Sequence, residues 1–226
     1  FFTSIGGQSR TNLAALDVRT GLARPWNSKL AYNGRVFVVG VHPNGRVLAG
    51  GNFRTVDGQA RSRIGALEIG TGVVTPWNPN VPTYDVGVKA LAVSGGTVYA
   101  GGKFTVIGGQ RRKNIAALDA ATGLAFAWDP SGYDINAANG EVQALAVSGG
   151  TIYAGGNFVQ FGGLTRNNLA AWDTATGLLT AWDPNARGPV FALAASNGNV
   201  HVGGNFSSVG GRIRNNVAAL DVRTGL

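Results

Sequence analysis

Arginine is the residue of this chain whose type and spacing most suggest binding chemistry. Five arginines occupy one position of a recurring pattern: Arg10, Arg61, Arg112, Arg166 and Arg214. A guanidinium group binds phosphate, sulfate or carboxylate through a planar pair of hydrogen bonds, so a ring of them could form an anion-binding face. A structural role is favoured instead. A residue kept at one phase of every repeat can pair with or stack on its own repeat, for instance near Asp129 or Asp183.

Aromatic and acidic residues also recur at fixed positions (phases) of the repeat, and each set of equivalent residues forms a column, as the five arginines do. The tryptophans are Trp26, Trp77, Trp128 and Trp182, and the phenylalanines are Phe53, Phe104, Phe158 and Phe206. An aromatic column could bind a ligand, but one large ring per repeat is typical of packing between repeats. The aspartates that precede Thr-Gly are expected to form Asx turns rather than a catalytic set: Asp17, Asp119, Asp173 and Asp221.

Two long connections between repeats are the other candidate binding segments. Residues 78–87 contain Tyr84 and Asp85, and residues 129–141 contain Tyr133 and Asp134. Insertions in repeat proteins often lie on the binding face, which predicts these segments on the same face as the arginines. The second connection also carries several oxygen donors, so a Ca²⁺ site there is a minor alternative, although the spacing does not match an EF-hand loop. No other cofactor is expected.

Residues for catalysis are sparse. Cysteine is absent, which excludes disulfides, thiolate metal sites and a cysteine nucleophile. The two histidines are His42, beside a turn, and His201, at a phase that Tyr99 and Tyr153 fill elsewhere. The sequence contains neither a Ser/His/Asp arrangement nor a phosphate-binding glycine loop. A hydrolase or lyase that uses a central channel is kept as a second alternative.

The elements that position these residues recur with a period near fifty. The column phenylalanines, counted from Phe2, are 51, 51, 54 and 48 residues apart by subtraction of their numbers. Each repeat contains four short apolar runs separated by tight-turn signals, and such runs predict antiparallel strands. The prediction is an all-β β-propeller of four-stranded blades of about 51 residues. Residues 1–33 and 190–226 are partial blades, and residues 34–87, 88–140 and 141–189 are complete ones.

One nine-residue sequence, AALDVRTGL, occurs both at 14–22 and at 218–226. The overlap fits either a four-bladed ring with a spare strand or part of a ring with more blades, and the second is favoured. The chain contains no methionine and starts and stops within a repeat. These features predict a processed product or a segment continuous with further repeats.

The net charge of +8 makes nucleic acids, anionic glycans and membrane surfaces candidate partners. Charged residues make up only 13% of the chain, and no basic run exceeds residues 111–113, which disfavours nucleic acid. Apolar runs are shorter than the 18 residues that a membrane-spanning helix needs, so no helical span is expected.

The recurring pattern GG-x-F-x-x-x-GG-x-x-R-x-N-[LIV]-A-A-[LW]-D-x-x-TG resembles the bacterial extracellular propeller repeats called delta-60 repeats. It is also similar to the repeats of the fungal cortical polarity-marker proteins. Residues 171–182 look like the tryptophan-docking motif of quinoprotein propellers, which locks blades together. The resemblance implies a structural or interaction module of a larger secreted or cell-surface protein, with protein or glycan partners. A carbohydrate- or anion-binding propeller that acts through its arginine face is the first alternative.

Overall fold

The fold is all-β, as predicted, in a computed structural model that describes residues 2–30, 34–82, 86–130 and 140–226. Four antiparallel sheets of three strands each follow one another along the chain. They are β3 (Val36–His42), β4 (Arg46–Gly51) and β7 (Ile64–Glu68); β8 (Gly87–Ser94), β9 (Thr97–Lys103) and β12 (Ile115–Asp119); β13 (Glu141–Ser148), β14 (Thr151–Asn157) and β17 (Leu169–Asp173); and β18 (Val190–Ser196), β19 (Asn199–Gly204) and β22 (Val217–Asp221).

A two-stranded hairpin interrupts each repeat between its second and third strands. The hairpins are β1 (Ser4–Ile5) with β2 (Gln8–Ser9), β5 (Thr55–Val56) with β6 (Gln59–Ala60), β10 (Val106–Ile107) with β11 (Gln110–Arg111), β15 (Gln160–Phe161) with β16 (Leu164–Thr165), and β20 (Ser208–Val209) with β21 (Arg212–Ile213). Each column arginine is therefore the residue that directly follows the second strand of its hairpin.

The fourth strand of each blade is shorter than predicted. The segment after the Thr-Gly turn makes a single bridge to the third strand, at Leu16–Ala23, Leu67–Val74, Leu118–Ala125 and Trp172–Leu179. One further ladder bond follows, such as that from Phe126 N to Ala117 O at 2.9 Å. The chain then leaves the sheet because its tryptophan turns toward the next sheet. The blades are thus three-stranded sheets with a short fourth segment.

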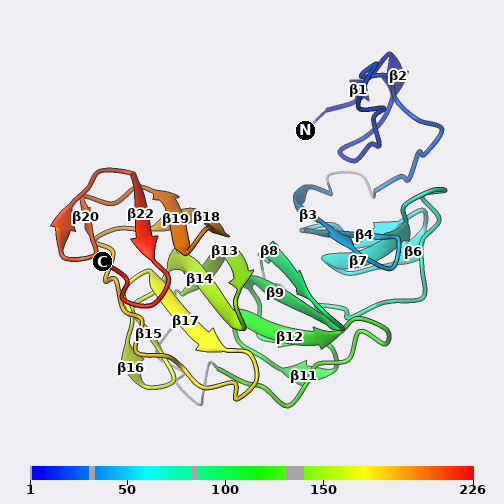
Figure 1. The fold of residues 1–226 in the computed structure, drawn as a ribbon. Coiled ribbons are helices and arrows are strands. Elements are labelled where there is room, and N and C mark those ends of the chain that lie inside the picture. The colour runs from blue at the N-terminus through cyan, green and yellow to red at the C-terminus, as the bar shows by residue number, and fades with distance from the viewer. Residues whose placement is uncertain (1, 31–33, 83–85, 131–139) are drawn as a thin grey trace.

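The sheets are arranged as the blades of a β-propeller. They follow one another around an arc, and the two termini lie at its two ends (Figure 1). The inner strands contact each other in chain order, β3 to β8, β8 to β13 and β13 to β18. No helix that could cross a membrane occurs in the described residues.

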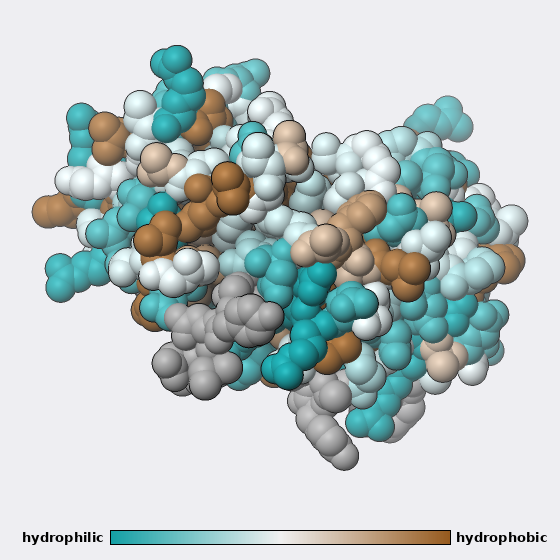
Figure 2. All heavy atoms as spheres, turned by 90° about the horizontal axis from the view of Figure 1, so that it is seen from below, coloured by the Kyte–Doolittle hydropathy of each residue, from teal (hydrophilic) through white to brown (hydrophobic). Residues whose placement is uncertain are grey.

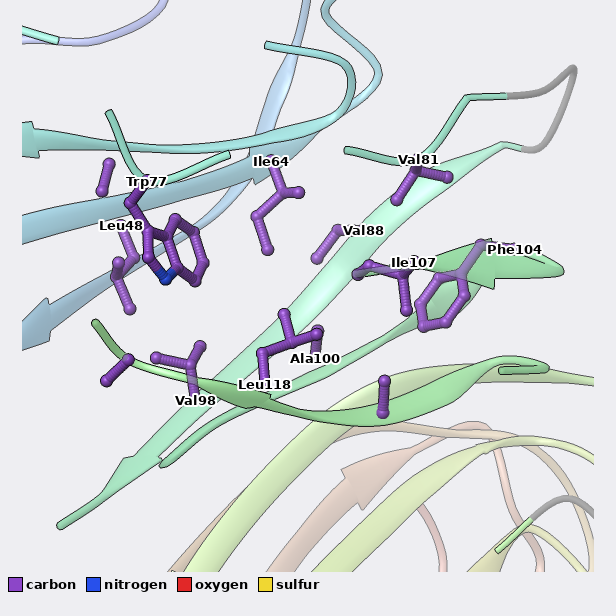
Figure 3. Packing of buried hydrophobic residues seen from close by; sticks show 13 residues of the cluster. Leu48, Ile64, Trp77, Val81, Val88, Val98, Ala100, Phe104, Ile107 and Leu118 are labelled. Carbon is purple, nitrogen blue, oxygen red and sulfur yellow. The ribbon is translucent and has the colours of Figure 1, made fainter. Parts of the chain in front are cut away.

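The hydrophobic core lies between the faces of successive sheets. Figure 3 shows one such layer, in which Leu48 and Ile64 face Val98 and Leu118 of the following sheet. The sheets approach so closely that a Cβ on Gly101 would lie 2.5 Å from the Val142 side chain. The first glycine of such a pair is therefore required by the contact between blades, whereas the second, such as Gly102, lies against the backbone of the first strand of its own sheet.

Candidate functional site

The arginine column folds back onto its own repeats. In four copies a terminal guanidinium nitrogen donates to a carbonyl 14 residues further along the chain. The bonds run from Arg10 to Arg24, from Arg61 to Thr75, from Arg112 to Phe126 and from Arg166 to Thr180, at 2.8, 2.5, 2.6 and 2.9 Å. Arg214, at the same phase, is half-buried. Each bond ties the hairpin of a repeat to its fourth segment.

Two column arginines also face a carboxylate of their own repeat. A terminal nitrogen of Arg112 lies 3.9 Å from Asp129, and one of Arg166 lies 3.6 Å from Asp183. Carbonyls and carboxylates thus already surround these cations. This geometry favours the structural interpretation of the column over an open ring of anion-binding groups.

The tryptophan column lies between successive sheets. The indole N–H of Trp77 donates to the carbonyl of Asp119, that of Trp128 to Gly177, and that of Trp182 to Asp221, at 3.1, 2.8 and 3.0 Å. Each acceptor belongs to the Thr-Gly turn of the following repeat. Trp26 is buried at the same place, against Gly72, whose carbonyl accepts a bond from Ser28 Oγ at 2.7 Å. The column phenylalanines Phe53, Phe104, Phe158 and Phe206 are all buried.

The turn aspartates bind their own turns. Asp119 Oδ1 accepts bonds from the main-chain N–H of Ala121 and Thr122 at 3.0 and 2.6 Å, and from the Thr122 hydroxyl at 2.8 Å. These donors, first the Thr122 N–H, lower the pKa of Asp119 because they stabilise the charged carboxylate. The same arrangement lowers the pKa of each other column aspartate: Asp17, Asp173 and Asp221.

The described part of the chain has a gap in each long connection, at residues 83–85 in the first and at residues 131–139 in the second. Tyr84, Asp85, Tyr133 and Asp134 lie outside the described residues, as does most of the proposed calcium-binding segment. Glu141, at the end of that segment, forms an ion pair with Lys89, whose Nζ lies 2.8 Å from Glu141 Oε1. In the part of the chain that the structure describes, no three His, Asp or Glu side chains gather as metal ligands would.

The histidines occupy separate environments. His42 is buried, and its Nδ1 accepts a bond from the N–H of Asn44 at 3.2 Å. His201 pairs with Ala219 across the sheet, in the register that Tyr99 shares with Ala117, and is exposed. The two imidazoles therefore belong to different elements and form no acid–base pair.

Inner-strand bulges are the feature that the sequence analysis missed. The ladder of each first strand skips one residue, between Val36 and Val38 and at the same place in the other three sheets. The skipped residues are Phe37, Lys89, Gln143 and Phe191. A bulge turns a side chain out of the regular alternation. The sequence does carry one signal of the bulge, which is a strand position whose residue type differs among the repeats while the residues on either side of it stay nearly the same.

The four bulge residues occupy equivalent positions of successive sheets, but their side chains differ in chemical type. Phe37 and Phe191 are 39% and 50% exposed, which is unusual for phenylalanine. Lys89 and Gln143 both contact the carboxylate of Glu141, and the Gln143 amide donates to it at 3.1 Å. Two exposed rings thus flank a polar cluster along the inner strands. On the face in Figure 2, apolar side chains gather only in small, separate patches.

A cleft opens between the sheets of the third and fourth repeats. It measures about 370 Å³ and is lined by Tyr99, Phe126 and Trp128 on one side and by the turn at 173–177 on the other. Trp128 makes edge contacts with Tyr99 and with Trp172, at centroid distances of 5.8 and 6.0 Å. Unlike the other column tryptophans, Trp128 is only half-buried. The cleft combines aromatic surface with turn hydroxyls.

Comparison with known proteins agrees with the propeller architecture. The family profile of a β-propeller domain of unknown function, DUF5122, matches residues 42–64. The chain is built of β-propeller repeats. Comparison with curated protein sequences gave no match.

Solved structures resemble this fold at low sequence identity. The computationally designed Ika4 protein superposes with a TM-score of 0.55 and 17% identity, over 86% of this chain and 96% of its own. The RRP9 WD40 repeats match with a TM-score of 0.53 and 13% identity, over 79% and 48% of the two chains. The Neurospora crassa Pan2 WD40 domain gives 0.53 and 13%, over 92% and 55%. This chain thus spans about half the length of the two WD40 chains.

Proposed function

We propose that this chain is a non-enzymatic interaction propeller whose partner contacts the inner-strand bulges. The observation that carries the proposal is the contrast between columns. The repeated Arg, Trp and Asp residues are bound within the scaffold, whereas the bulges hold Phe37, Lys89, Gln143 and Phe191 at equivalent places with different chemistry. Exposed aromatic residues beside a charged cluster suit recognition of a protein segment.

A display library of random peptides tests this proposal directly. Peptides are selected on the immobilised chain and then measured against a variant with serine at all four bulge positions. A matched control carries serine at Leu124 and Leu178, which are exposed on other elements. Selected peptides should lose binding to the bulge variant and keep it on the control. Undiminished binding to the folded bulge variant would refute the proposed surface.

The proposed setting is a larger secreted or cell-surface protein, in which this propeller is one structural part. The support is the likeness of its repeats to extracellular repeat families. Protease treatment of intact source cells, followed by detection with an antibody against the chain, tests the setting. Loss of the signal from cells, or its presence in the medium, is expected; recovery only after lysis would contradict it.

A carbohydrate site in the cleft is a second candidate function. Sugar rings stack on aromatic faces, and the cleft offers Phe126 and the half-buried Trp128 beside threonine hydroxyls. A panel of neutral and sulfated glycans is the probe, with Phe126→Ala as the test variant. Leu124→Ala, on the same segment and 60% exposed, is its control. Glycan binding that survives Phe126→Ala would exclude this cleft.

A further inference from the structure

Two polar groups in the cleft between the third and fourth repeats lack the partners that their equivalents have one interface later. There, the Tyr153 hydroxyl donates to the carbonyl of Val222 at 3.2 Å. Tyr99 and Thr174 are the equivalent pair in the cleft. In the described part of the chain, neither the Tyr99 hydroxyl nor the Thr174 carbonyl makes a hydrogen bond, although Tyr99 is only 6% exposed. Buried polar groups are normally hydrogen-bonded, so a ligand in this cleft should offer partners to both.

The tryptophan of the cleft also lies differently from its equivalents. Trp77 donates to the carbonyl of Asp119, the first residue of the following turn, at 3.1 Å. Trp128 instead donates to Gly177, at the other end of its turn, at 2.8 Å. The carbonyl of Asp173 therefore has no indole donor, and the Trp128 ring is half-buried whereas that of Trp77 is buried. This placement of the indole leaves an aromatic surface and turn acceptors open to a bound molecule.

A cation fills the equivalent place between the second and third repeats. Arg46 opens β4 as Thr97 opens β9, and a terminal nitrogen of Arg46 donates to the carbonyl of Ala120 at 3.2 Å. Ala120 directly follows the aspartate of its turn, and Thr174 is its equivalent in the cleft. Thr97 is too short to make this contact, so the Thr174 carbonyl is left for a ligand. The chain thus supplies, in one interface, the positively charged N–H donor that a ligand would bring to the cleft.

The charge of the cleft itself also favours a cation. Among the described residues that line it, Asp173 is the charged one, and its pKa is lowered, first by the main-chain N–H of Thr176, so it is ionised at neutral pH. One interface later, burial and, more weakly, the charge of the turn aspartate Asp221 raise the pKa of Tyr153, so the two side chains lie near each other there. Aromatic rings add attraction, because a cation binds to the negative face of a ring.

We propose that the cleft binds an amino sugar through its ammonium group. The inference rests on the carbohydrate site proposed above and adds the charge of its ligand. An ammonium has three N–H donors and no acceptor, which suits the Thr174 carbonyl and the Asp173 carboxylate. The sugar ring stacks on Phe126 and Trp128, and Tyr99 donates to a ring hydroxyl. The net charge of +8 repels cations at long range, so a preference for a cationic sugar has to come from the cleft itself.

Two oligosaccharides of the same shape test the charge of the ligand. The fully deacetylated glucosamine tetramer and cellotetraose differ in an ammonium or a hydroxyl on each ring, and both are titrated calorimetrically at mildly acidic pH. The cationic tetramer should bind about tenfold more tightly, because its hydrogen bonds are charge-assisted. Asp173→Asn should remove most of this preference and leave the affinity for cellotetraose unchanged. Asp119→Asn, in the same turn of the preceding repeat and outside the cleft, is the matched control and should keep the preference.

A second variant fills the cleft with a cation of the chain's own. Thr97→Arg copies the second repeat, where Arg46 already binds the turn carbonyl, and should weaken binding of the cationic tetramer at least tenfold. Equal affinity of the unaltered chain for the two tetramers, or a preference that survives both Asp173→Asn and Thr97→Arg, would overturn this proposal and leave the carbohydrate site in place. Binding of neither tetramer would refute the carbohydrate site itself, and this inference with it.

Discussion

Arg63 lies where the four other repeats have an asparagine, and three of those asparagine amides make the bond that Arg63 makes. Its terminal nitrogen donates to the carbonyl of Val81 at 2.8 Å, as Asn168 Nδ2 donates to Ala186 at 2.9 Å and Asn114 Nδ2 to Gly140 at 2.7 Å. Arg63 and Asn168 also share the left-handed backbone, with φ of 66° and 63°. Both residues tie the start of a third strand to the connection that leads into the next blade.

Replacing Arg63 by asparagine should stabilise the chain. Asparagine tolerates a left-handed backbone better than arginine does, and its amide can make the same bond to Val81. The expected gain in the free energy of unfolding is about 0.5–1 kcal/mol, measured by urea denaturation. Arg63→Ala is the control, and it should destabilise the chain because it loses the bond and keeps the strained backbone. A loss of stability in Arg63→Asn would contradict this account.

The Thr-Gly turn of the second repeat should not accept a side chain. A Cβ on Gly72 would lie 1.8 Å from Trp26 Cδ1. Gly58 has the same backbone, φ 76° against 75°, but open space around it. Gly58→Ala should cost about 1–2 kcal/mol for the left-handed conformation alone. Gly72→Ala should cost about 1–3 kcal/mol more, because the indole must move.

Tryptophan emission during unfolding measures both glycine variants. The Gly72→Ala protein should also show a changed native emission spectrum, since Trp26 is displaced from its buried position. Equal unfolding free energies for the two variants would show that Trp26 does not depend on that turn.

The turn aspartates should make stability fall in acid. Their pKa values are lowered in the folded chain, so their contribution is complete above the unfolded value of about 3.9 and is lost as pH falls through the folded value. Asp119→Asn keeps a neutral acceptor and should flatten the dependence of stability on pH between about 5 and 2. The check is urea denaturation at a series of pH values.

The architecture could be predicted from the sequence because the recurring positions of the repeat hold residues with strict backbone or packing requirements. The period, the tight turns and the one-per-blade tryptophans follow from short-range rules, and the structure confirms the all-β propeller. The fourth strand was overestimated because the apolar run before Trp77 looks like a strand but leaves the sheet when the indole reaches Asp119 of the next repeat. Local propensity cannot show such a departure.

The inner-strand bulge escaped prediction for a related reason. Lys89 stands in an otherwise apolar strand, and whether the strand bulges there depends on pairing with Gly101 and Gly102 of its neighbour. The left-handed position of Arg63 was hidden as well, because the repeat places asparagine there and arginine gives no turn signal. Both features depend on the pairing and backbone conformation of the folded sheet, which the local sequence does not specify.

The ion pair between Lys89 and Glu141 should couple two neighbouring blades. It joins β8 to β13 at 2.8 Å with side chains only 29% and 15% exposed. Glu141→Gln should cost about 1–3 kcal/mol, because Lys89 would keep a partly buried charge without its partner, discounted for residual solvent access. Lys89→Met combined with Glu141→Leu should recover most of that loss.

A double-mutant cycle separates this pair from an exposed one in the same chain. The pair of Arg24 and Asp17, at 3.1 Å, has side chains 60% and 30% exposed. Its coupling energy should be small and should vanish at high salt, because water and ions screen it. The coupling of Lys89 with Glu141 should exceed it and persist in salt. Equal coupling energies for the two pairs would mean that the blade contact does not depend on this bridge.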